Sequence, residues 1–371
     1  MSAAVPRRPR RWVVAGGGTG GHVTPALALA ERIRGRGDEV LLLGSKRGLE
    51  GRLVPAAGFE LAALPSRQLI GQSLAARLRT LIGLPGTVLA ARRVLREFGA
   101  EIVISVGGYA AAPAVAAAVL SRLPIALVNT DALPGQTNRI AGRFARRIFV
   151  GFPGATAAFP SARDPRRVQC LGIPLRRALT DGFGAAPPRR DARPPFRLLV
   201  FGGSQGARQL NDAMIEAAPR LVALGIEVFH QTGEADRNRV ASAYAVAGLR
   251  AEVAPFEPEM VKRYRWADVA LCRAGALTVA ELALAGLPAL LVPYPHAAHD
   301  EQSANARELV EAGAALRLDP HRFSADDVAA ALGELFAAPE RLAAMSRAAA
   351  KLARPDAAER IVEECATLLG A

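Results

Sequence analysis

The stretch "VVAGGGTGGHVTPALALA", residues 13–30, brings a hydroxyl and an imidazole to a glycine-rich turn. An apolar run leads into glycines 16–18, Thr19 and glycines 20 and 21, and His22 stands directly before an alanine-rich helical pattern. Glycines let a backbone approach a phosphate, and a helix N-terminus offers free N–H groups. A neutral imidazole there, with its pKa lowered by the positive end of the helix dipole, could take a proton from an attacking hydroxyl, or it could donate to a loop carbonyl. Both roles of His22 stay open.

The same glycines formally match G-x-G-x-x-G, the turn of dinucleotide-binding domains. Such a site also needs an acid at the end of the second strand, to bind ribose hydroxyls. Here "DEVLLLGSKRG" (38–48) ends in Gly44, Ser45 and Lys46, and its acids precede the strand. No lysine follows the glycines as a P-loop requires. We therefore expect no nicotinamide or flavin cofactor, which counts against a Rossmann oxidoreductase.

Two further glycine turns follow apolar runs. Gly107, Gly108 and Tyr109 end one predicted strand, and "GGSQG" (202–206), which contains Ser204, ends another. Each could be only a tight strand-to-helix turn. The first lies in the same half of the chain as residues 16–21, so those two turns should share one sheet edge and could hold a pyrophosphate through backbone donors.

The segment "CRAGALTVAELALAGLPALLVPYP", residues 272–295, predicts a strand followed by a helix that begins near residue 276 or 277. Thr278 and Glu281 then stand three apart in its first turns. A carboxylate at that place can accept two hydrogen bonds from neighbouring sugar hydroxyls. Thr278 and Glu281 could equally form a capping box, and the sequence leaves both interpretations open.

No metal site is expected. The other histidines form no i, i+4 pair: His230, His296, His299 and His321. No D-x-D motif occurs, and the three cysteines (Cys170, Cys272, Cys365) are widely spaced in apolar contexts. Such cysteines are typical of a reduced, cytoplasmic protein without a zinc site or disulfide framework.

Strand and helix patterns alternate along the chain and predict βαβ units with buried parallel sheets. Residues 11–17, 38–44, 101–108 and 124–130 read as strands; after the Pro/Gly/Arg-rich segment 173–196 the pattern restarts with strand, glycine turn and helix at 197–214. Further strands are expected at 225–231, 251–256, 268–275 and 288–294. The prediction is an α/β protein with two doubly wound, Rossmann-like domains facing each other across a cleft.

The positive net charge of the chain favours a surface that binds an anionic partner. The formal net charge is +13, and residues 66–100 place Ile70, Leu74, Leu78, Leu81, Ile82 and Leu84 among Arg67, Arg77, Arg79, Arg92, Arg93 and Arg96. That mixture suits an anionic membrane surface, although an amphipathic helix packed on its own sheet is the commoner case in general. Aromatic residues are only 5% and no nucleic acid is expected. The N-terminus lacks an apolar stretch typical of a signal peptide, and no run is long enough to cross a bilayer.

At the level of whole motifs the chain resembles glycosyltransferase family 28. The matching segments are GGGTGGHVTPALALA (16–30), GGY (107–109), LPGQTNR (133–139), GFPGA (151–155), LGIPLR (171–176), GGSQGARQLN (202–211), RAGALTVAELALAGLPALLVP (273–293) and NARELVEAGAA (305–315). They follow the order and spacing of the members that make lipid II in peptidoglycan synthesis, over essentially the whole chain.

The resemblance implies a GT-B fold and a metal- and cofactor-free, inverting transfer of N-acetylglucosamine (GlcNAc) from UDP-GlcNAc. The acceptor would be the C4 hydroxyl of undecaprenyl-pyrophosphoryl-MurNAc-pentapeptide (lipid I), at the cytoplasmic face of the cell membrane. It implies an acceptor- and membrane-binding domain at 1–175, a linker at 176–196, a UDP-GlcNAc-binding domain at 197–355, and a last helix at 356–371 that packs on the first domain. A cell-wall synthesis complex is a further implied partner.

The same resemblance assigns site residues by motif. His22 is the catalytic base or its helper, and the acceptor positions are Gly17, Gly18, Gly107, Gly108 and Tyr109. The donor positions are Thr19, Gly20, Gly21, Asp131, Arg176, Ser204, Phe256, Glu257, Met260, Ala276, Leu277, Thr278, Val279, Ala280, Glu281 and Gln302. Phe256 and Met260 would lie near the uracil.

Three segments depart from the family pattern. The usual HEQN reads "VNTD" (128–131), so Asp131 replaces a donor-contacting amide and an acid is absent; GGYVSGP reads "GGYAAAP" (107–113). Glu257 replaces the usual isoleucine and is expected to contribute backbone groups only. These changes keep two alternatives open: a related transferase with another lipid acceptor such as diacylglycerol, and a non-catalytic membrane-bound paralogue.

Overall fold

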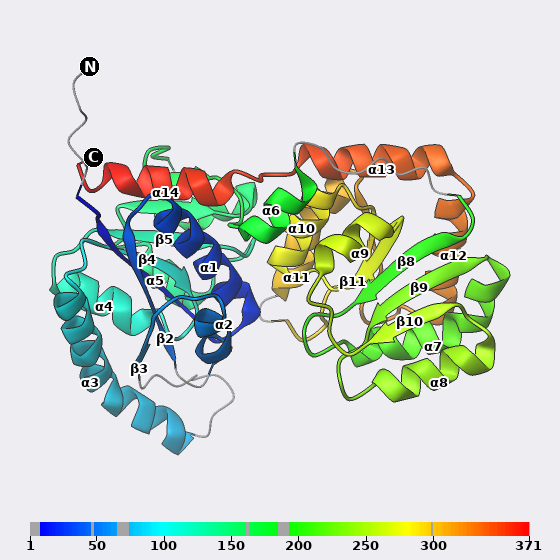
Figure 1. Cartoon of the computed structure of the whole chain (residues 1–371), viewed down its shortest axis with the longest axis horizontal. Coiled ribbons are helices and arrows are strands. Elements are labelled where there is room, and N and C mark those ends of the chain that lie inside the picture. The colour runs from blue at the N-terminus through cyan, green and yellow to red at the C-terminus, as the bar shows by residue number, and fades with distance from the viewer. Residues whose placement is uncertain are drawn as a thin grey trace. The chain divides into compact units, whose positions relative to one another are not determined.

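A computed structural model describes residues 8–45, 48–64, 74–160, 163–184, 193–297 and 300–370, without the side chains of 74–82. The chain forms two compact units, Met1–Arg177 with Pro355–Ala371, and Ala178–Arg354. Part of the segment expected to be a linker is helical, as α6 (Arg177–Phe183). Figure 1 shows both units as parallel sheets covered by helices.

The first unit contains, in its described part, a seven-stranded parallel sheet in the order β3-β2-β1-β4-β5-β6-β7. The strands are β1 (Arg11–Gly16), β2 (Glu39–Ser45), β3 (Leu61–Leu64), β4 (Ile102–Gly107), β5 (Ile125–Asn129), β6 (Arg147–Val150) and β7 (Val168–Cys170). The helices are α1 (Gly20–Gly35), α2 (Glu50–Ala56), α3 (Leu74–Phe98), α4 (Ala112–Leu120), α5 (Gln136–Ala141) and α14 (Ala357–Thr367), with a 3₁₀ turn η1 (Pro153–Ala158).

Both faces of this sheet are buried, which explains why its strands read as continuous apolar runs. Alternate residues of β1 point to opposite faces: Trp12 and Val14 pack in one core cluster, Val13 and Ala15 in another. The first cluster is completed by α1 and by Ile361, Val362 and Cys365 of α14, while α3 and α4 complete the second. In Figure 1, α14 (red) accordingly lies along α1 (blue).

The second unit repeats this plan with a parallel sheet of six strands among the described residues, in the order β10-β9-β8-β11-β12-β13. The strands are β8 (Phe196–Phe201), β9 (Ile226–Gln231), β10 (Ala251–Ala254), β11 (Val269–Cys272), β12 (Ala289–Leu291) and β13 (Ala315–Arg317). The helices are α7 (Arg208–Ala223), α8 (Arg237–Ala247), α9 (Met260–Trp266), α10 (Ala276–Ala285), α11 (Glu301–Glu311), α12 (Ala325–Phe336) and α13 (Pro339–Lys351).

The predicted doubly wound parallel sheets are confirmed in both units. Strand order reverses between β1 and β4 in the first and between β8 and β11 in the second, and ligands of such sheets bind outside the strand ends at these points. Four strands that the sequence patterns did not predict, β3, β6, β7 and β13, lie toward the sheet edges and have only three or four residues each. None of the described helices is both long and apolar enough to span a bilayer.

Candidate functional site

The two glycine turns of the first unit meet, as predicted, at the point where strand order reverses. Gly16, the last residue of β1, pairs with Gly107, the last residue of β4, after a one-residue shift in register. A Cβ atom on Gly108 would lie 2.3 Å from the carbonyl oxygen of Gly17. Gly107 and Gly108 have φ of 94° and 80°, values that favour glycine. The turns can therefore touch only because these positions lack side chains.

His22 lies in the first turn of α1, directly beside this junction. Thr19 precedes the helix in an extended conformation, and its hydroxyl lies 3.0 Å from Nδ1 of His22. A Cβ on Gly107 would lie 3.2 Å from Cδ2 of the ring, and one on Gly108 would lie 3.4 Å from Nδ1. The contact that the structure shows for the ring is thus a hydroxyl, and not the loop carbonyl that the alternative role required.

Burial lowers the pKa of His22 below its ordinary value, while the charges of Asp131 and Glu50 act in the opposite direction. The helix N-terminus was expected to lower this pKa; the direction is the same, but the main cause is desolvation. A histidine with a lowered pKa is neutral at pH 7, the form that a general base requires.

Gly17 and Gly18 contact a carboxylate that the sequence reading did not single out. Oε2 of Glu50 accepts the N–H of Gly18 at 2.9 Å, and the Tyr109 ring lies against the other side of Gly18, where a Cβ would approach it to 2.7 Å. The Gly18 amide is therefore already bonded. Gly20 and Gly21 lie in the first turn of α1, where N–H groups have no partner within the helix.

Amide side chains hold the segment "VNTD" (128–131), which differs from the family pattern. Nδ2 of Asn129 donates to the carbonyl of Asp131 at 2.7 Å, and Nδ2 of Asn138 donates to Oδ1 of Asn129 at 2.9 Å. Oδ1 of Asn138 is buried without a hydrogen-bond partner among the described residues, and a Cβ on Gly107 would lie 2.8 Å from it. Asn129, where the family has an acid, thus shapes the strand end and leaves Asp131 as the carboxylate of this segment.

Arg176 lies at the end of the first unit. Its Nε and Nη2 donate to Oε1 of Glu31 on α1 at 2.8 and 2.5 Å, and the Arg177 amide donates to Oε2 of the same carboxylate. The predicted donor-contacting arginine is therefore held on α1 by an ion pair.

The glycine turn of the second unit, residues 202–206, packs against the backbone at the end of β9. A Cβ on Gly206 would lie 1.8 Å from the carbonyl oxygen of Thr232, and one on Gly233 would lie 2.2 Å from the carbonyl oxygen of Gln205. Nε2 of Gln231 donates to the carbonyl of Gly203 at 2.9 Å. Ser204 at the tip of the turn is exposed, so its hydroxyl is available to a ligand.

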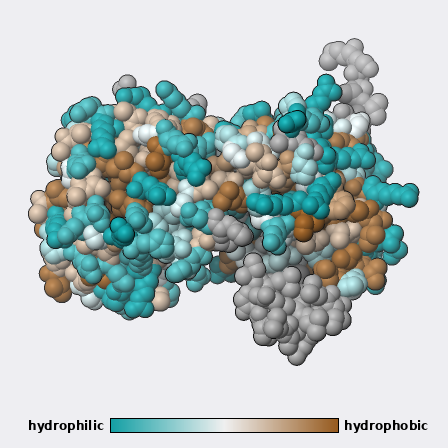
Figure 2. Space-filling view, turned by 180° about the vertical axis from the view of Figure 1, so that it is seen from behind, coloured by the Kyte–Doolittle hydropathy of each residue, from teal (hydrophilic) through white to brown (hydrophobic). Residues whose placement is uncertain are grey.

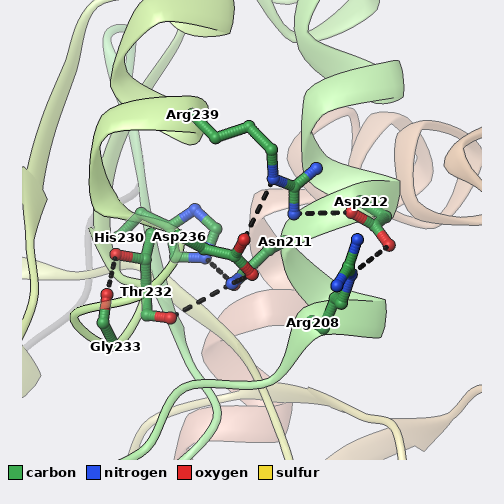
Figure 3. A network of polar contacts seen from close by, with 8 residues as sticks. All are labelled: Arg208, Asn211, Asp212, His230, Thr232, Gly233, Asp236 and Arg239. Carbon is green, nitrogen blue, oxygen red and sulfur yellow. Dashed lines mark hydrogen bonds and ion pairs between the residues drawn. The ribbon is translucent and has the colours of Figure 1, made fainter.

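A buried chain of hydrogen bonds fixes the backbone at Thr232, against which this turn packs (Figure 3). Nδ2 of Asn211, on α7, donates to the Thr232 carbonyl at 3.1 Å and to Asp236 at 2.8 Å. Its Oδ1 must then accept from Nε2 of His230, 3.0 Å away. Nδ1 of His230 is left to accept from the hydroxyl of Tyr244 at 2.7 Å.

Because His230 is neutral, each hydrogen bond in this chain has a fixed donor and a fixed acceptor. Burial lowers the pKa of His230 to about 3. At the surface the chain ends in ion pairs, where Arg239 contacts Asp236 and Asp212 and Arg208 contacts Asp212 (Figure 3). A neutral, fully directed network thus fixes the carbonyl against which Gly206 packs.

Helix α10 begins at Ala276, as predicted, and the capping-box interpretation of Thr278 and Glu281 is wrong. The residue that caps α10 is Gly275, and no side chain bonds to its first turn. Glu281 instead accepts the hydroxyl of Tyr264 at 2.6 Å, and burial raises the pKa of Glu281 to about 7. Along the same turns, Ala276 and Val279 are buried, and Leu277, Thr278 and Ala280 are half-buried.

The remaining predicted donor residues lie in the segment after β10 and at the starts of α9 and α11. Phe256 is 57% exposed, unusual for a large aromatic side chain, and Met260 begins α9. Oε1 of Gln302 accepts the amides of Ala274 and Tyr294 at 3.2 and 2.9 Å, so it joins the ends of β11 and β12.

Glu257 was expected to contribute backbone groups only, and its buried side chain has a structural role. It accepts the amide of Glu259 and Nε of Arg263, which also pairs with Glu252. These bonds and the positive charge of Arg263 oppose the desolvation of the Glu257 carboxyl and keep its pKa below the usual value. Arg263 explains how this chain tolerates an acid in a buried place.

Within the described part of the chain, no three metal-ligating side chains gather.

Two doubly wound sheets, each with a glycine turn at its point of reversal, define a GT-B-like glycosyltransferase. The chain belongs to glycosyltransferase family 28: residues 12–150 match the model of the family's N-terminal domain and residues 197–361 that of its C-terminal domain.

Relatives cover nearly the whole chain. Proteins of Anaeromyxobacter sp. (strain Fw109-5) and Nitratidesulfovibrio vulgaris (strain DP4) are both 42% identical to it, over 97% of this chain and 93% and 98% of their own. Both are named UDP-N-acetylglucosamine–N-acetylmuramyl-(pentapeptide) pyrophosphoryl-undecaprenol N-acetylglucosamine transferase.

Solved structures agree with this family. The MurG of Acinetobacter baumannii is similar with a TM-score of 0.77 and 30% identity, covering 96% of this chain and 98% of that one. A UDP-GlcNAc 2-epimerase from Neisseria meningitidis shares the fold alone, with a TM-score of 0.67, 13% identity, and coverage of 96% and 100%.

The close packing of the second glycine turn against Thr232 yields a stability prediction. Gly206→Ala and Gly225→Ala both place a side chain at positive φ (74° and 67°), which costs each about 1–2 kcal/mol. Only at Gly206 does the new Cβ collide with a carbonyl, since nothing lies within 4 Å at Gly225. We expect Gly206→Ala to lower the thermal unfolding midpoint further and to speed amide exchange at 203–207 and 231–233. Equal effects of the two variants would show that the close approach to Thr232 does not matter.

Proposed function

We propose that this chain is an inverting hexosyltransferase that moves GlcNAc from UDP-GlcNAc to the C4 hydroxyl of lipid I and forms lipid II. The observation that carries the proposal is the 42% identity with transferases of that name over 97% of the chain, with both glycine turns and His22 in place. The product is a precursor of peptidoglycan, so the activity serves cell wall synthesis and, through it, cell shape and division.

The donor site of the proposal lies on the second unit. The free amides at the start of α10 face the UDP phosphates, with the hydroxyls of Ser204 and Thr278 as further donors. Glu281 accepts the two ribose hydroxyls, and the exposed ring of Phe256, with Met260, lies against the uracil. Gln302 and the backbone at Glu257 support this surface, and Thr19, Gly20, Gly21, Asp131 and Arg176 of the first unit complete the donor contacts.

The acceptor site of the proposal lies at the junction of the glycine turns in the first unit. The pyrophosphate of lipid I lies along the turns at Gly17–Gly18 and Gly107–Tyr109. His22 takes the proton from the C4 hydroxyl as that oxygen attacks the anomeric carbon of GlcNAc. The bond to UDP breaks in the same step, so the configuration inverts, and the N-terminus of α10 stabilises the leaving diphosphate. No metal takes part in this scheme.

A turnover assay tests the proposal directly. We expect UDP release from UDP-GlcNAc only when a lipid I analogue is present, and no release with diacylglycerol. His22→Ala should lower kcat by about 100-fold or more, the range for a general base, while UDP affinity stays unchanged. Release with another lipid only would indicate a different acceptor, the alternative that the "VNTD" segment suggests. UDP binding without turnover on any acceptor would indicate the non-catalytic paralogue.

The raised pKa of Glu281 yields a pH prediction for donor binding. Only the ionised carboxylate can accept both ribose hydroxyls, and its pKa of about 7 in the free protein means that it becomes protonated as pH falls below 7. UDP-GlcNAc is the suitable ligand, because its diphosphate diester does not titrate in this range. We expect its affinity, measured by calorimetry, to fall below pH 7 by up to about tenfold per pH unit.

Two variants serve as controls for this titration. Glu281→Gln should bind about tenfold more weakly at pH 8 and show no pH dependence, whereas His22→Ala should keep the pH dependence of the unmodified protein. A wild-type affinity that is constant from pH 8 to pH 5.5 would remove Glu281 from the donor site.

We also propose that the first unit binds the cytoplasmic face of the cell membrane through the end of α3. Leu84 and Leu89 on α3 and Leu120 at the end of α4 are exposed, and a hollow at the C-terminal end of α3 is lined by Leu89, Arg92, Arg93, Arg96 and Ser121. Hydrophobic residues gather in patches on both units (Figure 2), so apolar exposure alone selects no face. The combination with arginines distinguishes this one. Residues 65–73 and the side chains of residues 74–82, which carry the rest of the expected stretch, lie outside the described part.

Vesicle binding tests this surface. Arg92 and Arg96 are exposed on α3, and each contributes about 1 kcal/mol at an anionic bilayer, so the double change to glutamine should weaken binding about 30-fold. The measurement compares phosphatidylcholine vesicles with and without phosphatidylglycerol, at low and high salt. The matched control changes Arg341 and Arg347, exposed on α13, and should bind as the wild type does. Equal losses in the two pairs would assign the effect to net charge alone.

A further inference from the structure

The carboxylate of Glu50 lies beneath the first glycine turn and bonds to two separate segments. Glu50 is 1% exposed and begins α2. Its Oε2 accepts the amide of Gly18 at 2.9 Å, and its Oε1 accepts the amide of Ser45, the last residue of β2, at 2.8 Å. One side chain thus ties the turn after β1 to the end of β2.

Three glycines make room for this carboxylate. A Cβ on Gly17 would lie 2.3 Å from Oε1, one on Gly48 would lie 2.2 Å from Oε2, and one on Gly44 would lie 2.9 Å from Cγ. These glycines come from three places in the chain: the first turn, the end of β2, and the segment before α2. Any side chain at these positions would displace Glu50, so the backbone is shaped around the carboxylate.

The turn that Glu50 holds leads directly to His22. Gly18 is followed by Thr19, whose carbonyl accepts the amide of His22 at 3.1 Å and whose hydroxyl contacts the imidazole. The position of the ring therefore depends on the position of Gly18. Burying a carboxylate is expensive unless hydrogen bonds satisfy it, and two amide donors do so here.

The charged and titratable groups that face His22 come from three elements. Glu50 approaches from α2 and Asp131 from the segment after β5, and their negative charges both raise the pKa of His22 against the effect of burial. Tyr109, after β4, packs on Gly18. Since Asn129 stands where the family has an acid, Glu50 and Asp131 are the carboxylates that act on His22 in this chain.

We propose that Glu50 is a positioning residue for His22: it fixes the turn that places the imidazole, and its charge stabilises the imidazolium formed when His22 takes the acceptor proton. The second half of this statement rests on the proposed transferase function. A consequence follows for the acceptor, because the carboxylate occupies the amide of Gly18. The pyrophosphate must then bond to other backbone amides of the two glycine turns.

The test measures the pKa of His22 by NMR and the pH profile of kcat in wild type, Glu50→Gln and Glu50→Asp, with UDP-GlcNAc saturating so that the titration of Glu281 does not limit the rate. Removing the charge in Glu50→Gln destabilises the imidazolium, so the pKa of His22 and the acid limb of the profile should both move to lower pH by about 0.5–1 pH unit. We expect kcat to fall at least about tenfold, with the KM for UDP-GlcNAc within about twofold of wild type. Asp131→Asn should shift the same limb without disturbing the turn.

Glu50→Asp separates charge from position, since it keeps the carboxylate and shortens its reach. We expect it to keep the pKa of His22 close to that of wild type while kcat falls. The proposal is overturned if Glu50→Gln lowers thermal stability and kcat but leaves the pKa of His22 in place. Should Glu50→Gln not fold, a pKa in Glu50→Asp lowered by a full pH unit would overturn it equally. The NMR titration needs no turnover, so it also distinguishes failure of this inference from failure of the transferase assignment.

Discussion

The direct approach of backbone to backbone where β1 and β4 end is the constraint on which the first unit depends. Gly108 comes so close to the carbonyl of Gly17 that no side chain fits between them. The strand order that brings these ends together requires β1 and β4 to be neighbours although about ninety residues separate them. Once they are neighbours, the imidazole of His22, the amide of Asn138 and the ring of Tyr109 converge on one small region. A single larger residue at either turn would separate them.

Each unit holds its glycine turn with a buried polar anchor, and the two anchors differ in charge. In the first unit the anchor is the carboxylate of Glu50, which lies close enough to His22 to favour its protonated form. In the second unit it is the chain Tyr244–His230–Asn211, whose buried members are neutral. A negative anchor suits a turn that must support a base as it gains a proton.

Much of the site was predictable because glycine turns, strand ends and helix starts have local signals. Gly16–Gly21, Gly107–Gly108 and residues 202–206 follow apolar runs, and the start of α10 was placed within one residue. Glu50 and Asn211 have no such signal, because each forms its hydrogen bonds with backbone groups that are distant in the sequence. Glu257 shows the same limit: its acid is explained only by Arg263, a partner that the pattern around it does not indicate. The strands β3, β6, β7 and β13 were missed, whereas the equally short β10, β11 and β12 were predicted from the longer apolar segments that contain them.

The sequence by itself determined the family, the two doubly wound sheets and the list of candidate residues, because these depend on local patterns and on motifs with fixed spacing. The tertiary structure decided how those residues act. It showed that Glu281 forms no capping box but is half-buried and bonded to Tyr264, that burial is the main cause of the lowered pKa of His22, and that the Gly18 amide is bonded to a carboxylate. The reason is physical: desolvation, hydrogen-bond partners and the room for a Cβ depend on atoms brought together from distant parts of the chain, and no local pattern contains them.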